Sequence, residues 1–304
     1  MTSSIQGSGK GGVFALGNFD GVHRGHQVVI SAALDKARNM GVTANVLTFE
    51  PHPRSLFQPN TAPFRLTPAQ VKIRLLQGLA IAEVNVIPFT PTFSQLSASA
   101  FVEEILVHTY GVQHIVAGFD FVFGFKRAGN MENLRSWLSP HNVGVTEVAP
   151  FRDAEGEIMS SSRARQALQE GNLRAAEHVL GRSWSIAGIV QKGAQRGREL
   201  GFPTANIGLG DYLRPKFGVY AILAARVGKS EKWRGVANIG VRPTVDGKEE
   251  LLEFHLFDFQ EEIYGQEWEV VLLHFLRPER SFSDIDALRA QIISDVMAAK
   301  AMLA

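Results

Sequence analysis

The 304-residue chain contains no cysteine. Disulfide bonds and metal sites built on thiolates are therefore excluded. The chain also lacks an excess of charge of either sign, because 31 Lys and Arg against 30 Asp and Glu leave a net charge of +1. This balance does not indicate the basic surface of a nucleic-acid-binding protein, and we expect no nucleic-acid partner.

Apolar runs long enough to cross a membrane are also missing, and residues 1–8 lack the apolar centre of a signal peptide. We therefore expect a cytoplasmic protein without a membrane partner. The hydrophobic content of 45% is ordinary for globular proteins, and the length suits about two domains.

The strongest chemical signal is the stretch Gly17–His26, which reads GNFDGVHRGH. The apolar run 13–16 before it predicts a buried strand, and residues 27–39 after it predict a helix. Glycines let such a strand-to-helix turn approach a ligand closely, and the helix N-terminus offers N–H groups to an anion. His23 and His26 could then face one phosphate.

Two imidazoles at a helix N-terminus suit nucleotidyl transfer, because negative charge develops on the transferred phosphate and on the leaving pyrophosphate. The HxGH pattern resembles the signature of the adenylyl- and cytidylyltransferases. A single His in a glycine-rich turn is more often structural. The pair around Gly25, with Asp20 nearby, favours a functional interpretation.

The first half of the chain alternates between the two kinds of secondary structure, which predicts a doubly wound parallel sheet of the α/β class. The expected strands are 13–16, 42–49, 81–89 and 112–117, and the expected helices are 27–39, 68–79, 97–109 and 160–170.

Residues 118–129, GFDFVFGFKRAG, contain four Phe, which would be costly to leave exposed. One interpretation is a hydrophobic plug beneath the sheet. The other is a platform for a planar ring that includes Phe121 and Phe123, with Asp120 as a polar contact and Arg127 near a phosphate. The sequence favours neither.

The run 160–165, SSSRAR, opens the last helix of this half. Serines at a helix N-terminus are first of all caps. Arg163 and Arg165 could also clamp triphosphate oxygens through charge-assisted hydrogen bonds.

Short strands follow without helices between them, which predicts an antiparallel barrel or sandwich. They are expected at 185–191, 218–226, 233–239, 251–259 and 268–275, before a C-terminal helix at 283–303 capped by Ser283. The sequence thus predicts domains at 1–182 and 183–304.

Within this half, Thr204 and Asn206 of the run GFPTAN would present two neutral oxygens on one side of an extended segment, which suits Mg²⁺. Taken alone, the run is better explained as a turn with two capping residues. The preceding loop 192–197 is basic and glycine-containing and could cover phosphates. Glu253 lies on the polar face of its strand, either simply solvated or, in a pocket, as a general base.

Together these pieces are similar to one family, the bifunctional riboflavin kinase/FAD synthetases of bacteria, over about residues 12–296. The similar pieces are GNFDGVHRGH, TFEPHPR, GFDFVFGFKRAG, SSSRAR, RGRELGFPTANI, GVANIGVRPT, LEFHLFDF and LRPERSF. The resemblance implies a Rossmann-like FMN adenylyltransferase domain followed by a six-stranded riboflavin kinase barrel. It also implies ATP as co-substrate at two sites, Mg²⁺, and riboflavin, FMN and FAD as ligands.

The resemblance and the residue patterns together define the predicted site residues. The catalytic residues are His23, His26 and Glu253, and the metal ligands are Thr204 and Asn206. The nucleotide-binding residues are Gly17, Phe19, Asp20, Gly25, Ser161, Arg163, Arg165, Lys192, Gly193 and Arg196. The substrate-binding residues are Asp120, Phe121, Phe123, Arg127, Arg277 and Phe282.

The chain departs from the family pattern at Ser162 and Ala164, where Thr and Ile are usual, and at Trp184, where a Pro-Tyr pair is usual.

Other hypotheses are a kinase with a degenerate adenylyltransferase half, another nucleotidyltransferase fused to a binding barrel, and a non-catalytic flavin carrier. The intact histidine pair and Glu253 argue against a carrier.

Overall fold

The computed structural model describes residues 10–192, 201–244 and 247–304. Among these, residues 10–62 and 67–161 pack as one compact unit, and residues 63–66 and 162–304 pack as another. The segment 162–182 thus packs with the second unit, whereas the boundary predicted from the sequence leaves it in the first. Each unit is described by itself.

The first unit is built on a parallel sheet with the strand order β3-β2-β1-β4-β5. Its strands are β1 (Val13–Leu16), β2 (Ala44–Glu50), β3 (Glu83–Pro88), β4 (His114–Gly118) and β5 (Gly144–Val148). The order reverses direction between β1 and β4. Open α/β sheets bind ligands at the carboxyl ends of the strands beside such a point, and the Gly17–His26 turn leaves β1 there.

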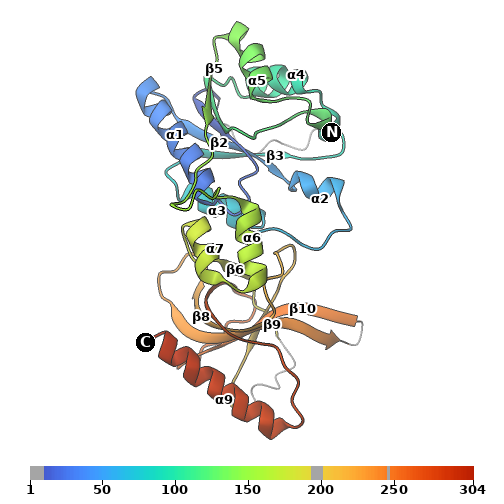
Figure 1. Ribbon diagram of the computed structural model, residues 1–304, viewed down its shortest axis with the longest axis vertical. Coiled ribbons are helices and arrows are strands. Elements are labelled where there is room, and N and C mark those ends of the chain that lie inside the picture. The colour runs from blue at the N-terminus through green and yellow to red at the C-terminus, as the bar shows by residue number, and fades with distance from the viewer. Residues whose placement is uncertain (1–9, 193–200, 245–246) are drawn as a thin grey trace. The chain divides into compact units, whose positions relative to one another are not determined.

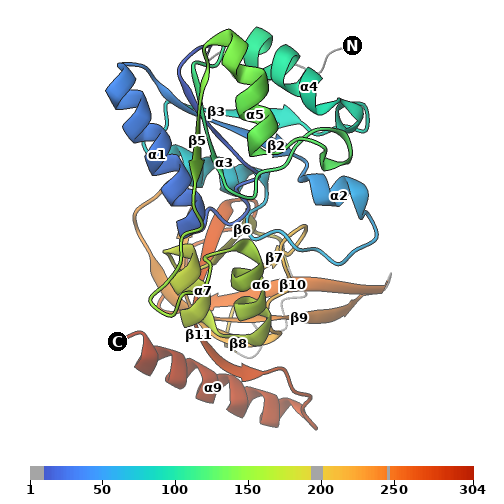
Figure 2. The same ribbon diagram turned by 45° about the horizontal axis from the view of Figure 1, so that its top comes forward.

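Helices cover both faces of this sheet (Figures 1 and 2). On β1, Val13 and Ala15 pack on the side of α1, while Phe14 and Leu16 pack on the side of η2 and α5. The helices are α1 (Arg24–Met40), α2 (Pro53–Phe57), α3 (Ala69–Gln77), α4 (Ala98–Ala100) and α5 (Met131–Leu138). Shorter or irregular turns are η1 (Phe93–Gln95), the π-helix η2 (Phe101–Thr109), η3 (Phe125–Arg127) and η4 (Ser139–His141).

The second unit is an antiparallel barrel with the order β6-β11-β8-β9-β10-β7. Its strands are β6 (Ser185–Ile189), β7 (Ala205–Gly208), β8 (Gly218–Arg226), β9 (Trp233–Thr244), β10 (Gly247–Leu256) and β11 (Glu267–Pro278). The edges nearly close, because the Gln191 N–H donates to the Asn206 carbonyl at 2.8 Å. The predicted α/β fold with a following barrel and a C-terminal helix is confirmed.

Among its described residues, the second unit also contains the helices α6 (Ser161–Glu170), α7 (Leu173–Leu180) and α9 (Ile285–Met302). Ala299 of α9 packs on Val219, Ala221 and Val236, which face outward from β8 and β9. The expected cap of this helix was wrong. Asp284, not Ser283, accepts the Ala287 N–H at 2.8 Å, and Ser283 instead donates its hydroxyl to Asp284.

None of the helices in the described ranges is long and apolar enough to cross a membrane.

The buried Tyr110 side chain provides a stability test for the core of the first unit. Its side chain is 2% exposed and its hydroxyl has no hydrogen-bond partner among the described residues. Burial, with a smaller contribution from Glu83, raises its pKa to about 12. An unfolded Tyr loses its proton near pH 10, so the unfolded chain binds fewer protons above that pH and stability falls as pH rises from about 10 to 12.

We expect Tyr110→Phe to leave stability at pH 7 nearly unchanged and to reduce the loss of stability above pH 10. Urea unfolding between pH 7 and 11 measures both effects. Tyr220→Phe is the matched control. The Tyr220 hydroxyl donates a hydrogen bond to the Lys216 carbonyl, so its removal should lower stability already at pH 7. A clear destabilisation by Tyr110→Phe at pH 7 would show that its hydroxyl does have a partner.

Candidate active sites

The turn that leaves β1 holds residues in a conformation that few side chains adopt. Phe19 (φ 52°) and Val22 (φ 43°) both lie in the left-handed region, although neither is Gly. Such residues cost roughly 1–3 kcal/mol each and persist where the surroundings hold them. The Phe19 ring lies against Gly17, where an added Cβ would approach it to 3.0 Å, so this packing requires glycine.

Buried hydrogen bonds hold this turn in place. The Asp20 carboxylate, 2% exposed, accepts the Thr67 N–H at 3.0 Å and the Thr67 hydroxyl at 3.2 Å. The Gly21 N–H donates to the Thr67 hydroxyl at 2.8 Å, and the Ser161 hydroxyl donates to the Asp20 carbonyl at 2.8 Å. Asp20 and Ser161, far apart in the sequence, therefore both fix the shape of the turn.

The two predicted histidines stack on each other at the start of α1, with ring centroids 3.6 Å apart and an interplanar angle of 25°. His23 is the N-cap, and its Nδ1 accepts the His26 N–H at 3.3 Å. A neutral His23 ring in this arrangement carries its proton on Nε2. The Phe19 ring meets His26 edge-on at 5.2 Å.

Gly25 lies between the two histidines, where only a residue without a side chain fits. An added Cβ would lie 2.8 Å from the Met159 carbonyl oxygen and 3.1 Å from the His23 ring. The arrangement places two imidazoles beside the positive end of a helix, where they can stabilise negative charge on a bound phosphate.

The Phe-rich loop 118–129 has features of both interpretations, with one buried ring and others that are exposed. Phe123 is 7% exposed and packs in the core against Phe101, at 5.5 Å, and Phe121, at 5.6 Å. Phe119 and Phe125 instead remain 43% and 38% exposed. The loop therefore combines a buried anchor with exposed aromatic rings. Its charged members, Asp120, Lys126 and Arg127, are exposed.

Arg163 and Arg165 lie half-buried on α6. Arg165 donates from Nε to the Phe64 carbonyl at 2.8 Å, and its guanidinium lies 5.5 Å from the Phe64 ring centroid. The Arg165 side chain thus holds the segment 63–66 within the second unit.

The predicted kinase residues meet on one face of the barrel. Glu253 of β10 pairs directly with Asn206 of β7, so their side chains share a face, and Thr204 lies two residues earlier. The Thr204 hydroxyl donates to Glu253 Oε1 at 2.6 Å. Asn206 is 3% exposed, and its amide has no hydrogen-bond partner among the described residues.

Neighbouring contacts hold the segment that carries Thr204. His255 Nδ1 donates to the Pro203 carbonyl at 2.8 Å, and its ring packs edge-on against Phe202 at 5.6 Å. Lys192, exposed, lies with its ammonium 5.5 Å from the Tyr264 ring centroid. Gly193 and Arg196 lie outside the described residues.

Arg277 is engaged by the C-terminal helix. Its guanidinium donates to both carboxylate oxygens of Asp295, with the shortest distance 2.7 Å, and to the Pro278 carbonyl at 3.0 Å. The Arg277 guanidinium lies 5.8 Å from the Phe282 ring centroid. Arg277 therefore links the end of β11 to α9 and to the segment that follows β11.

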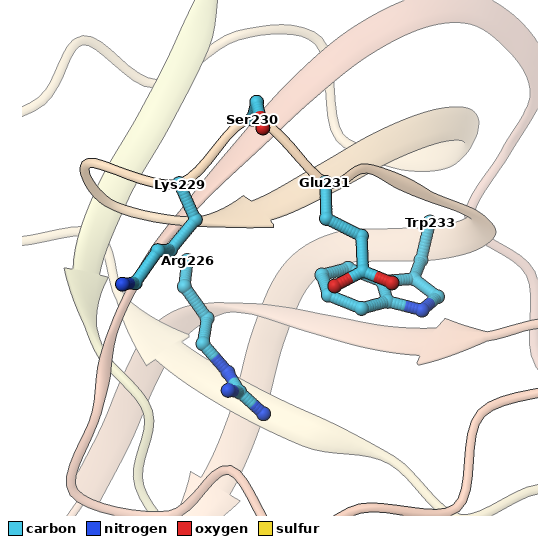
Figure 3. A pocket seen from close by; sticks show the side chains of 5 residues that line it. All are labelled: Arg226, Lys229, Ser230, Glu231 and Trp233. Atoms are coloured by element: carbon cyan, nitrogen blue, oxygen red, sulfur yellow. The ribbon is translucent and has the colours of Figure 1, made fainter.

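A hollow of about 290 Å³ lies elsewhere on the barrel and contains none of the predicted residues. Figure 3 shows its lining, Arg226, Lys229, Ser230, Glu231 and Trp233. Trp233 lies five residues along β9 from Asn238, the residue that pairs with Glu253, which corresponds to about 17 Å of strand. Arg226 also pairs with Glu261, so its charge is compensated.

Comparison with known proteins covers both units. Residues 5–163 match the model of the FAD synthetase family, and residues 180–303 match that of the riboflavin kinase family. A bifunctional riboflavin kinase/FMN adenylyltransferase of Pseudomonas fluorescens is 42% identical over 97% of this chain and 94% of its own length. The chain belongs to this family.

Other relatives in the family carry the same description. The protein of Escherichia coli K12 is 38% identical over 96% of this chain and 92% of its own length. The protein of Bacillus subtilis is 40% identical over 93% and 90%. A solved structure from Streptococcus pneumoniae, described as a macrolide-efflux protein, superposes with a TM-score of 0.82 at 32% identity and covers 96% of this chain and 94% of its own.

Sequence reasoning missed the residues that support these two sites. Thr67 holds Asp20 but lies just before the expected helix 68–79, and Asn238 pairs with Glu253 but was assigned only to the strand 233–239. The family resemblance included Asn238 in GVANIGVRPT without giving it a role. Asn238 Nδ2 donates to Glu279 Oε1 at 3.1 Å.

Two glycines of the first unit test how tightly the Phe-rich loop is held. Gly124 (φ +73°) would place a Cβ 2.5 Å from Ala98 Cα, whereas Gly156 (φ +85°) has nothing within 4 Å. We expect Gly156→Ala to cost about 1–2 kcal/mol from backbone strain alone. Gly124→Ala should cost clearly more, because the backbone of α4 must also move. Equal losses in chemical unfolding would contradict this close packing.

Proposed function

We propose that the second unit phosphorylates riboflavin to FMN and that the first unit adenylylates FMN to FAD, each with ATP. The observation that carries this proposal is that each unit holds its own catalytic arrangement. The first has a stacked histidine pair at a helix N-terminus, and the second has a carboxylate aligned by a threonine on a barrel face.

In the adenylyl transfer, a phosphate oxygen of FMN attacks the α-phosphorus of ATP, and the bond to the departing pyrophosphate breaks. His23 and His26 would stabilise the negative charge on the transferred phosphate, together with the N–H groups that begin α1. The His23 cap supports this role, because acceptance at Nδ1 leaves the proton on Nε2.

In the kinase reaction, Glu253 would accept the proton of the riboflavin 5′-hydroxyl as that oxygen attacks the γ-phosphorus of ATP and ADP leaves. The Thr204 hydroxyl supports this role by orienting the carboxylate at 2.6 Å. Since a hydroxyl has one proton and two lone pairs, Thr204 can donate to Glu253 and still offer an oxygen to a cation.

The residues at this face fit Mg²⁺. Thr204 and Asn206 would hold the ion through neutral oxygens, which Mg²⁺ accepts alongside phosphate oxygens and water. The Asn206 amide supports the fit, because it is buried without a hydrogen-bond partner among the described residues. When bound, the ion neutralises phosphate charge and orients the γ-phosphate.

The remaining predicted residues are proposed to bind substrates. Asp120, Phe121 and Arg127 would contact FMN, with Phe123 anchoring their loop from the core. The charge of Arg277 is already paired with Asp295. Arg277 would therefore contribute to substrate binding by ordering the segment that ends at Phe282, not by offering its charge to the substrate.

Basic and small residues complete the proposed nucleotide sites. For Arg163 and Arg165, which pack in the second unit, a role at the triphosphate site of the first reaction stays a prediction from the sequence, and Lys192, Gly193 and Arg196 are proposed for that of the kinase. The functional boundary at residues 182 and 183 is proposed from the sequence, and the riboflavin kinase match begins close to it, at residue 180. A cytoplasmic location is proposed from the sequence alone.

The test assays the two reactions separately, with either riboflavin or FMN supplied beside ATP and Mg²⁺. We expect Glu253→Gln to lower FMN formation by about 10²–10⁴-fold, because the proton acceptor is lost. His26→Ala should lower FAD formation by about 10²–10³-fold, because a stabilising group is lost. Products are resolved by chromatography.

Each variant serves as the control for the other, because the two substitutions lie in different units. Glu253→Gln should leave FAD formation from supplied FMN intact, and His26→Ala should leave riboflavin phosphorylation intact. A variant that loses both reactions, or neither, would refute the assignment of that residue.

A further inference from the structure

A lysine is completely buried in the first unit. Lys72 lies on α3 with 0% of its side chain exposed. Its ammonium forms an ion pair with Glu50 Oε1 at 2.6 Å and donates to Thr48 Oγ1 and to the Phe49 carbonyl, both at 3.1 Å. Fully buried lysines are rare because removing the charge from water is costly. Replacing a buried ion pair by apolar side chains often leaves the free energy of unfolding unchanged or raises it. A buried charge such as that of Lys72 is therefore better explained by the groups that it holds in position.

The fourth contact of Lys72 reaches the catalytic turn. The ammonium donates to the Asn18 carbonyl at 3.2 Å, and Thr48 Oγ1 donates to the same carbonyl at 3.2 Å. Asn18 immediately precedes Phe19, whose φ is +52°. On the other side of Phe19, Asp20 is held by Thr67. The strained residue is thus fixed from both sides.

Phe19 connects this anchoring to the chemistry. Its ring meets His26 edge-on at 5.2 Å, and His26 stacks on His23. A turn that relaxed toward ordinary φ values would withdraw the Phe19 ring from His26. Because strained backbone persists only where its surroundings over-determine it, the hydrogen bonds to Asn18 bear directly on the position of the imidazole.

We propose that Lys72 is a positioning residue of the adenylyl-transfer site. It fixes the Asn18 carbonyl and so keeps Phe19 packed against His26. The inference rests on the proposed FMN adenylylation and adds to it a residue remote from the phosphate-binding motifs.

The experiment uses the full chain with Lys72→Met, which keeps the length of the side chain and removes its charge. The matched control is Leu106→Ala in η2, which is fully buried and packs in the core on the other face of the sheet, in a different cluster from Phe19. Both are assayed with FMN, ATP and Mg²⁺ at a temperature where circular dichroism shows them folded.

We expect Lys72→Met to lower kcat for FAD formation on the order of tenfold to a hundredfold, as misplacement of a catalytic group does. The KM values should change much less, because the contribution is made in the transition state. Leu106→Ala should lower the unfolding temperature but leave kcat close to that of the unsubstituted chain. Riboflavin phosphorylation, measured in the same samples, should stay unchanged in both variants.

A spectroscopic readout separates positioning from stability and from activity. The Phe19 ring current shifts the imidazole proton signals of His26, which are assigned in the NMR spectrum with His26→Gln. Lys72→Met should move these signals toward those of Phe19→Leu, whereas Leu106→Ala should not.

Unchanged His26 signals together with an unchanged kcat in Lys72→Met would overturn the proposal, as would an equal loss of kcat in Leu106→Ala at equal stability. If Lys72→Met does not fold, Thr48→Val removes the other bond to Asn18 and should shift kcat and the signals in the same direction. If the unsubstituted chain forms no FAD, the proposed adenylylation fails, and only the NMR comparison then decides whether Lys72 positions His26.

Discussion

A turn that must keep Phe19 and Val22 in the left-handed region is the constraint around which the first unit is organised. A short-range hydrogen bond joins the Val22 N–H to the Phe19 carbonyl at 3.1 Å, and more distant elements add the hydrogen bonds from Thr67 and Ser161. The same turn begins α1 and stacks its two histidines. The parallel sheet contributes by ending its strands at one edge, where these groups converge at the positive end of a helix.

The second unit reaches its site by a different physical route. In an antiparallel barrel, directly opposite residues share a face, so register alone places Asn206 and Glu253 side by side. The Thr204 hydroxyl then orients the carboxylate, and His255 fixes the backbone one residue earlier through Pro203. A site made from strand pairing needs no strained turn, but it depends on the pairing of β7 with β10.

Local patterns in the sequence predicted the secondary-structure elements that short-range interactions determine. The buried strand at 13–16 and the strand at 218–226 form as expected, because each is a compact apolar run between clear breaks. The sequence did not predict β7, whose four residues form a strand only by pairing with β10, or the pairing of Arg277 with Asp295. Phe123 could not be assigned because its partner Phe101 is distant in sequence. The strained φ of Phe19 leaves no trace in residue type.

One chain thus transfers a phosphoryl group from ATP to riboflavin and then an adenylyl group from a second ATP to the FMN formed. The most direct measurement is a chromatographic time course of the purified unsubstituted chain with riboflavin, ATP and Mg²⁺ as its only substrates and ion. We expect FMN to appear first and FAD to follow, with one pyrophosphate released for each FAD formed. Accumulation of FMN without FAD would contradict it, because the histidine turn of the first unit would then serve another reaction.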